Sequence, residues 1–324
     1  MRAVVYERYG PPEVLELREI PKPTPTDHEV LIKIHATTVS ALDWRVRSLS
    51  GPKGFGFLMR LALGPSRPRR PILGAELSGE IESIGPAVSK FKVGDQVFAG
   101  VLGSYVEYKC VHEDGPLALK PTNLGYEEAA ALSFGGVTAL TAVRKGRIQS
   151  GESVLINGAS GAVGTAAVQL AKHHGARVTG VCSTPNLELV KSIGAEHVID
   201  YTREDFTRSG ETYDVVVDNV GNAPFSRVKG SLKKGGRLLL VVGTLSEMLL
   251  APLVSLGSGK RVLPVPARPR AEDLRFLASL AESGSFKPVI DRRYPLEQIV
   301  EAHRYVEKGH KKGNVVITVV DNSG

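Results

Sequence analysis

Two patterns of hydrophobic and polar residues divide the chain. Up to about residue 120, short segments in which apolar and polar residues alternate are separated by Gly and Pro, and residues 30–35 show the alternation most clearly. A period of two is typical of strands that bury one face. The predicted strands are residues 3–6, 15–19, 29–36, 79–84, 96–99 and 104–111. This part of the chain therefore predicts an all-β domain.

The second pattern alternates strands with helices. Residues 153–157 are an apolar run typical of a buried strand, and the apolar spacing of residues 163–171 predicts one face of a helix. Strand, helix and strand patterns follow at residues 177–182, 187–193 and 198–200, and further strands are predicted at 213–218, 237–242 and 260–265. This alternation predicts an α/β fold with a central doubly wound parallel sheet of the Rossmann type.

The remaining segments set the domain boundaries. Helical patterns cover residues 126–132 and 137–143, before the sheet, and 271–283 and 296–307, after it; residues 289–294 and 314–320 read as extended. Because this tail lies outside the six-strand pattern, we expect it to return to the first domain. The predicted domains are residues 1–122, 123–266 and 267–324. Residues 51–71, rich in Gly, Pro and Arg, predict a surface loop or lid.

A glycine-rich turn joins the first strand of the predicted sheet to its helix. Gly158, Gly161 and Gly164 stand in it, and Ser160 takes the position of the central glycine in the usual G-x-G-x-x-G pattern. Glycines here permit a tight turn and leave the first N–H groups of the helix open to a pyrophosphate. An ordinary turn with close helix packing is the alternative, but the surrounding βαβαβ pattern favours a dinucleotide site.

Composition narrows the class of protein. The chain has 324 residues, 42% hydrophobic and 23% charged, which is typical of a globular protein of about two domains. The net charge of +7 is spread along the chain, so nucleic acid is not the expected partner. Two cysteines are too few for a disulfide framework. Residues 238–256 are interrupted by Glu247 and Pro252, and the start lacks an apolar signal segment, so we expect a cytoplasmic protein without a membrane partner.

The chain resembles the medium-chain dehydrogenase/reductase superfamily, specifically its zinc-free quinone oxidoreductase and enoyl reductase branch. The resemblance spans the full length and rests on residues 39–47, 73–79, 91–98, 136–142, 198–201 and 218–221 together with the glycine turn. It implies a GroES-like, mostly-β domain built from both termini, a central nucleotide domain, and an active site in the cleft between them. It also implies a homodimer that pairs through the edge of the nucleotide sheet, near residues 261–265.

The residue types argue against zinc. Catalytic zinc needs three Cys, His or carboxylate ligands around an open position. The zinc-dependent branch has a Cys where Ser40 stands and a His in a Gly-His-Glu motif that here reads Gly74-Ala75-Glu76. A four-cysteine structural lobe is also missing. No metal is therefore expected.

The end of the second nucleotide strand bears on the choice of cofactor. NAD-specific sites commonly place an acid there, whereas this chain has Cys182-Ser183-Thr184. A hydroxyl can donate to a 2′-phosphate, so NADPH is favoured and NADH is the weaker possibility. For Ser183, an ordinary helix cap is the alternative. The resemblance adds phosphate contacts from Asn186 and Tyr201, although relatives carry a Lys near Asn186. The expected cofactor residues are Gly158, Ser160, Gly161, Ala162, Val163 and Gly164 at the turn, Ser183, Asn186 and Tyr201 at the phosphate, and Thr138, Asn219, Val220, Gly243 and Thr244 along the nicotinamide half.

Without a Lewis acid, the easier reaction is hydride transfer to an electron-poor acceptor, a quinone or an α,β-unsaturated carbonyl. Ser40, Asp43 and Arg45 are the catalytic candidates: Asp43 to organise the pocket and Arg45 to steady an oxyanion. A structural Asp43–Arg45 pair is the alternative, and for Gly243-Thr244 the alternative is a simple turn. Two other functions stay open, an NADPH-binding sensor or RNA-associated protein with little turnover, and a zinc-free NADP-linked alcohol dehydrogenase.

Overall fold

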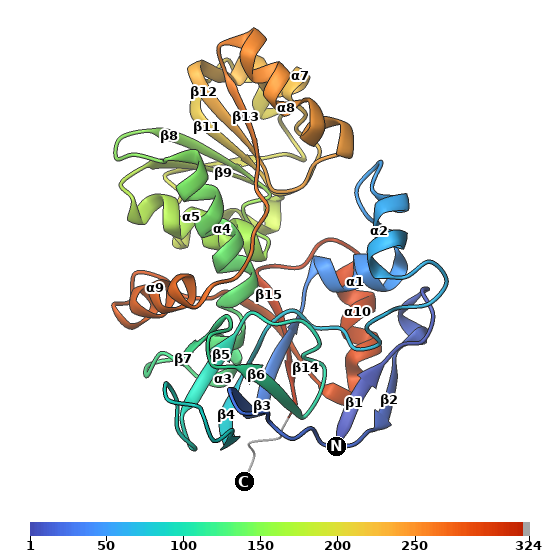
Figure 1. Cartoon of the computed structure of the whole chain (residues 1–324). Helices are drawn as coiled ribbons and strands as arrows, with labels where there is room; N and C mark the ends of the chain where they lie inside the picture. The colour runs from blue at the N-terminus through green and yellow to red at the C-terminus, as the bar shows by residue number, and fades with distance from the viewer. Residues whose placement is uncertain (320–324) are drawn as a thin grey trace. The chain divides into compact units, whose positions relative to one another are not determined.

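The computed structural model describes residues 1–319 and divides into two compact units (Figure 1). Unit 1 contains Met1–Gly51, Gly56–Phe134 and the C-terminal residues from Pro269 onward, and unit 2 contains Pro52–Phe55 and Gly135–Arg268. The predicted fold class, a parallel Rossmann sheet plus a mostly-β domain, is confirmed.

The division differs from the predicted boundaries at three places, the smallest being residues 267–268, which belong to unit 2. Residues 123–134 belong to unit 1 because helix α3 (Tyr126–Ala130) packs against the β-sheet of that unit, where the Ser78 hydroxyl donates to the Tyr126 carbonyl. Residues 52–55 belong to unit 2, where the Leu245 N–H donates to the Lys53 carbonyl at 3.1 Å.

Unit 2 is built on a six-stranded sheet in which every pairing is parallel. Its strands are β8 (Ser153–Asn157), β9 (Arg177–Cys182), β10 (His197–Asp200), β11 (Tyr213–Asp218), β12 (Leu232–Leu240) and β13 (Arg261–Pro264). The spatial order is β10-β9-β8-β11-β12-β13, so the direction of winding reverses between β8 and β11. Ligands of such sheets bind beyond the carboxyl ends of the strands at this reversal.

Helices cover this sheet between its strands. They are α4 (Ser133–Gly146), α5 (Ala162–His173), α6 (Leu187–Ser192), α7 (Phe225–Val228) and α8 (Leu245–Ser258), with α5 packed on β8 and β9 and α8 on β13 (Figure 1). Helix α4 runs through Gly135 and Gly136, which the sequence placed before a helix. A Cβ on Gly135 would lie 2.7 Å from the Ala162 carbonyl oxygen, so close packing on α5 explains the glycine. In residues 1–319, none of the helices is both long and apolar enough to cross a bilayer.

Unit 1 holds a seven-stranded sheet and a separate hairpin, β1 (Arg2–Val5) with β2 (Glu16–Glu19). The sheet strands are β3 (Glu29–Val39), β4 (Leu77–Ile84), β5 (Gln96–Ala99), β6 (Tyr108–His112), β7 (Leu117–Leu119), β14 (Ile290–Pro295) and β15 (Asn314–Thr318). The long β3 pairs with β4, β6 and β15 and is the centre of the unit. Its helices are α1 (Ala41–Ser48), α2 (Gly56–Leu63), α3, α9 (Ala271–Glu282) and α10 (Ile299–Glu307).

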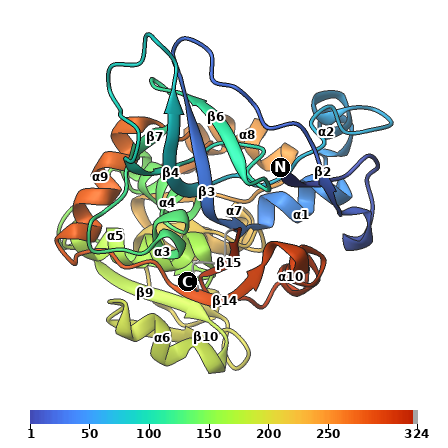
Figure 2. The same ribbon diagram turned by 90° about the horizontal axis from the view of Figure 1, so that it is seen from below.

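The C-terminal segment completes the sheet of unit 1. β15 runs antiparallel to β3, with Ile317 opposite Thr37, and β14 lies parallel to β15 at the sheet edge, so that β15 stands between β14 and β3 (Figure 2). The predicted last strand extended to Val320, which lies outside the described residues.

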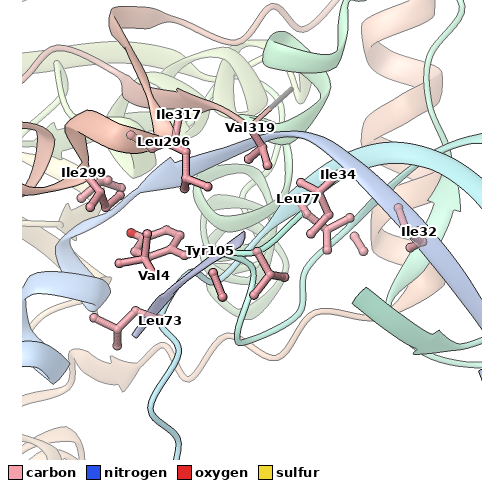
Figure 3. Packing of buried hydrophobic residues seen from close by; sticks show 14 of the residues in the cluster. Val4, Ile32, Ile34, Leu73, Leu77, Tyr105, Leu296, Ile299, Ile317 and Val319 are labelled. Atoms are coloured by element: carbon pink, nitrogen blue, oxygen red, sulfur yellow. The ribbon is translucent and has the colours of Figure 1, made fainter. Parts of the chain in front are cut away.

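The core of unit 1 joins residues from both ends of the chain. Val4 and Ile34 from the N-terminal strands pack with Tyr105, and with Leu296 and Ile317 from the C-terminal segment (Figure 3). All five side chains are fully buried. Because residues from both ends of the chain bury one another, neither terminal segment has a complete core by itself. Burial at about 25 cal/mol per Å² of apolar surface makes this shared core the main stabilising contribution in unit 1.

A buried arginine fastens α1 to α10. Arg47 has no exposed surface; its guanidinium donates to Glu307 Oε2 at 2.7 Å, to His303 Nδ1 at 3.0 Å and to the Gly10 carbonyl at 3.1 Å. Burial first, and then the nearby Arg47 charge, lowers the pKa of His303 to about 3, so its ring is neutral. A neutral ring can accept through Nδ1, as observed.

Glu76 joins β3 to the start of α4. Its carboxylate accepts from the Thr38 hydroxyl and from the Phe134 N–H, in a fully buried position. Burial raises the pKa of Glu76 to about 7, with a smaller contribution from Asp43 in the same direction and an opposing one from Lys311. The hydrogen bonds do not compensate fully for the loss of water around the charge.

We expect Glu76 to make unit 1 less stable as pH rises from about 5 to 7. In the unfolded chain its proton leaves near the ordinary value of 4.5, but in the folded chain only near 7, so over this window the unfolded state is favoured. The free energy of unfolding of the native protein, minus that of Glu76→Gln, should fall by up to about 1.4 kcal/mol per pH unit. Denaturant titrations across this window measure it. Buried Asp43 is present in both proteins and cancels, and exposed Glu19→Gln is the matched control. A difference that stays flat would contradict the raised pKa.

Candidate functional site: a dinucleotide cradle

The glycine turn lies where the prediction put it, between β8 and α5. Gly158 has φ +77°, and a Cβ there would lie 2.7 Å from Val220. A Cβ on Gly164 would lie 2.0 Å from the Gly158 carbonyl oxygen, so α5 can approach the strand only with glycine at that position. The alternative, that these glycines serve turn and packing, therefore holds for Gly158 and Gly164.

Gly161 is different from its two neighbours. It is the N-terminal cap of α5, and the nearest atom to an added Cβ, the Gly158 carbonyl oxygen, would be 3.8 Å away. The protein itself thus leaves room for a side chain at this position. Ala162 and Val163, half-buried in the first turn of α5, carry N–H groups that have no partner within the helix. A pyrophosphate fits this arrangement, because the N-terminus of a helix attracts anions and glycine permits close approach.

A polar cluster closes one side of the turn. Asn186 donates to the Ser183 hydroxyl at 3.1 Å and to the Ser160 hydroxyl at 3.3 Å. Its own Oδ1 is buried and has no hydrogen-bond partner within residues 1–319. Ser183 stands at the cap position of the following 3-10 turn, but its side chain makes no capping hydrogen bond. The cap alternative for Ser183 is therefore not what the structure shows.

The nearest acid at this edge is already engaged. Asp200, at the end of β10, accepts from the Thr184 hydroxyl and from the N–H and hydroxyl of Thr202. These bonds, the one from Thr184 first, lower the pKa of Asp200. Tyr201, the next residue, is 55% exposed. The carboxyl ends of β9 and β10 thus present hydroxyl and amide groups, while the carboxylate of Asp200 is engaged by Thr184 and Thr202.

The carboxyl end of β11 forms a second polar turn. Buried Asp218 accepts from the N–H groups of Val220 and Gly221, at 3.0 and 3.1 Å, and from the Asn157 side chain at 2.8 Å. Asn219 donates to the Asn157 carbonyl at 3.1 Å, and its buried Oδ1 has no partner in the described part of the chain. Together with that of Asn186, two buried amide oxygens at the strand ends lack a donor.

Thr244 has a role that the sequence analysis missed. It caps α8: its hydroxyl accepts from the Glu247 N–H at 3.2 Å, and the Glu247 carboxylate accepts from the Thr244 N–H at 2.8 Å. The pattern Thr-x-x-Glu before an apolar run is a known helix start and could have predicted α8. The simple-turn alternative for Gly243-Thr244 is thus replaced by a helix cap.

A pocket of about 620 Å³ lies beside this cap, within unit 2. It is lined by Gly221, Pro224, Thr244 to Glu247 and Leu249, and by Lys53 and Gly54 from the predicted surface loop. A Cβ on Gly54, which has φ +92°, would lie 2.9 Å from the Leu245 Cβ, so the loop is packed closely here. Nothing in the sequence indicated that Lys53 belongs to this wall. Thr138, the remaining cofactor candidate, is buried on α4.

The three catalytic candidates lie on α1 of unit 1. Ser40 is the N-terminal cap of the helix, and its N–H and hydroxyl donate to Asp43 Oδ2 at 2.8 and 2.6 Å. The Gly74 N–H donates to the other oxygen at 3.0 Å. Burial raises the pKa of Asp43, and the three donors oppose that shift. The structure thus gives Ser40 and Asp43 a clear capping role, while their part in chemistry stays a prediction.

Arg45 is not the partner of Asp43. Within residues 1–319, no carboxylate lies within ion-pairing distance of its guanidinium, so the alternative of a structural Asp43–Arg45 pair is wrong. The residue that does make the structural pair is Arg47 with Glu307. Burial lowers the pKa of Arg45, whose guanidinium lies 5.6 Å from the Trp44 ring centre.

The chain is similar to known oxidoreductases in both of its units. A family model described as alcohol dehydrogenase GroES-like domain matches residues 26–150, and one described as zinc-binding dehydrogenase matches residues 193–317. The chain is 33% identical to a chloroplast envelope quinone oxidoreductase homolog of Arabidopsis thaliana, over 98% of both chains. The chain belongs to the quinone oxidoreductase branch of the medium-chain dehydrogenase/reductase superfamily.

Two further comparisons agree with this membership. The chain is 31% identical to an NADPH-dependent alkenal/one oxidoreductase of the same plant, over 98% of this chain and 79% of that protein. The solved quinone oxidoreductase of Coxiella burnetii superposes with a TM-score of 0.87 at 29% identity, over 99% of both chains. Membership of this oxidoreductase superfamily extends over the whole chain and includes both units.

We expect Gly161→Ala and Gly164→Ala to fail in different ways. Gly161→Ala has room in the protein, so the melting temperature should stay within about 2 °C while NADPH binding weakens about tenfold or more, because the methyl group obstructs a pyrophosphate at the helix start. Gly164→Ala meets the Gly158 carbonyl and should lose stability itself. Calorimetry and nucleotide titration separate the two. Unchanged nucleotide binding by Gly161→Ala would contradict a pyrophosphate at this turn.

Proposed function

We propose that this protein is a zinc-independent, NADPH-dependent oxidoreductase that transfers hydride to a quinone or an α,β-unsaturated carbonyl. The observation that carries the proposal is the residue set at the metal positions of the superfamily. Ser40 is bonded to Asp43, position 75 is alanine, and Glu76 is occupied by Thr38 and Phe134. In residues 1–319, no three His, Cys, Asp or Glu side chains gather as a metal site requires. Although one matching family is described as zinc-binding, these residues do not support zinc.

The cradle in unit 2 fits a dinucleotide. Gly161 has space that no protein atom needs, and the amide oxygens of Asn186 and Asn219 are buried without donors. We infer that the start of α5 holds the pyrophosphate, that Ser183, Asn186 and Tyr201 hold a 2′-phosphate, and that Asn219 faces the nicotinamide half. When bound, this cofactor supplies the hydride. The hydroxyls at the end of β9 favour NADPH, since an acid there would repel the phosphate.

A reductase that uses no metal ion has no Lewis acid to stabilise negative charge on its substrate, and this limits the class of acceptor. An oxygen that gains negative charge must then be stabilised by protein donors, and a guanidinium without a carboxylate partner is suited to this. Arg45 is such a group in unit 1. Asp43 acts indirectly, since its carboxylate fixes the first turn of α1, the helix that carries Arg45 in its last turn. The names of the relatives, a quinone oxidoreductase homolog and an alkenal/one oxidoreductase, support both classes of acceptor.

The expected homodimer and cytoplasmic location stay predictions. β13 is an edge strand of the unit 2 sheet and, among the described residues, pairs only with β12, so it offers the pairing surface that the resemblance implies. Sedimentation velocity of the purified protein measures the oligomeric state.

We expect the protein to oxidise NADPH in the presence of a quinone or an enone, with a metal chelator making no difference. Arg45→Met should lower kcat by about tenfold to a thousandfold, because it removes a donor to the developing oxyanion. Its melting temperature should change little, because the guanidinium has no ion pair to lose. Arg304→Met, at an exposed position of α10, is the control for activity. Saturable NADPH binding without turnover on any acceptor would overturn the proposal and favour the sensor or RNA-associated function.

We expect Ser183→Asp to reverse the cofactor preference. A carboxylate at the end of β9 repels a 2′-phosphate and accepts from ribose hydroxyls, so KM for NADPH should rise about tenfold or more while KM for NADH falls. Ser183→Ala should weaken NADPH use alone, because it removes a donor without adding charge. Equal effects of both variants on both cofactors would contradict a 2′-phosphate site at Ser183.

A further inference from the structure

Helix α2 turns apolar side chains to solvent. None of its eight residues, Gly56–Leu63, is buried, and Phe57 is 77% exposed, Leu61 60% and Leu58 43%. In Figures 1 and 2 it lies at the periphery of unit 1, beyond α1. Scattered exposed leucines are common, but three large apolar side chains on two turns of one helix form a patch of the kind that marks an interaction site.

Contacts at the C-terminal end of α2 fix the helix to the rest of unit 1. Gly64, with φ +125°, ends it, and a Cβ there would lie 2.0 Å from the Arg67 carbonyl oxygen. The Arg69 N–H donates to the Leu63 carbonyl at 2.8 Å, and the Tyr9 hydroxyl donates to the Gly64 carbonyl at 3.0 Å. The apolar patch therefore stands on an ordered helix tied to unit 1, and it is followed directly by an ordered basic turn.

The charge around α2 has a single sign. Residues 44–75 contain seven Arg and Lys and no Asp or Glu. Four of these cations are exposed on the helix and on the turn that follows it: Arg60, Arg67, Arg69 and Arg70. In the described part of the chain, none of the four lies within ion-pairing distance of a carboxylate. An apolar patch with unpaired cations around it is complementary to a surface that has an anionic outer layer over an apolar interior.

Helix α8 provides the contrast within the same chain. Its leucines are as exposed, with Leu253 at 65% and Leu256 at 84%. Its only charged residue is Glu247, although Lys53 lies beside its first turn and Lys260 and Arg261 follow its end. Exposed apolar surface is thus common to both helices, whereas a cluster of four exposed arginines belongs to α2 and the turn after it.

We propose that α2 and the basic turn of residues 64–70 dock on the surface of an anionic lipid bilayer. Phe57, Leu58 and Leu61 would enter the boundary between headgroups and acyl chains, and the arginines would lie among lipid phosphates. Eight residues give a helix of about 12 Å, far shorter than the ~30 Å hydrocarbon core, so the helix lies in the interface and does not span it. The expectation of no membrane partner considered only spanning and signal segments, which a short interfacial helix escapes.

Vesicle flotation of the full-length protein tests the proposal. We expect binding to vesicles of phosphatidylcholine with phosphatidylserine, weak binding to phosphatidylcholine alone, and loss of the difference at high salt. Phe57→Ser with Leu61→Ser should weaken binding to both kinds of vesicle. Arg67→Gln, Arg69→Gln and Arg70→Gln together should remove the preference for anionic vesicles, by on the order of a hundredfold.

The control is Leu253→Ser with Leu256→Ser on α8, which removes equally exposed leucines and should leave vesicle binding unchanged. Each variant is first shown to keep the native melting temperature and NADPH binding. Neither of these two measurements depends on catalytic turnover. No flotation of the native protein, or flotation that the α2 variants do not reduce, overturns the proposal. A change of oligomeric state in the α2 variants, without vesicle binding, also overturns it, because a second copy of the chain would then cover this helix.

Discussion

The close approach of α5 to the end of β8 is the constraint on which unit 2 depends. It requires glycine at positions 158 and 164, where any side chain would meet Val220 or a carbonyl oxygen. Once α5 is seated, its N-terminus is directed to the edge where β9, β11 and β12 also end. The packing that the fold needs and the open N–H groups that a pyrophosphate needs are therefore produced by the same turn.

Unit 1 is organised by a different constraint, the closure of its sheet by the C-terminal segment. β15 supplies the partner that β3 lacks on one side, and α10 contributes Ile299 and Val306 to the core. The buried Arg47 then joins α10 to α1, the helix that carries Arg45. The last turn of α1 is thus held by contacts to residues more than two hundred positions away in the chain.

The buried acids of the described residues serve local structure. Asp43, Glu76 and Asp218 accept from backbone N–H groups at the start of α1, at the start of α4 and at the turn after β11. A carboxylate so bonded is poorly placed to bind a metal or take a proton from a substrate. Arg45 on α1 and the arginines around α2 are in contrast left without acidic partners among the described residues, which suits them to the oxyanion and phosphate contacts proposed above.

The sequence determined the βαβ alternation of unit 2, the glycine turn, most strand positions in unit 1, though not β7, and the family. These depend on local periodicity and on residues adjacent in the chain, which a pattern records directly. Only the tertiary structure decided what depends on distant partners: that Arg47 and not Arg45 makes the buried ion pair, that Lys53 lies on the wall of a pocket, and that Gly161 is the one glycine of the three in the turn with spare room. The segment of residues 51–71, predicted as a surface loop or lid, contains helix α2, and several leucines of α2 and α8 are exposed although hydrophobicity alone predicts burial. Whether a side chain is buried depends on the residues that pack around it in the folded structure, and the residue type at a single position does not specify them.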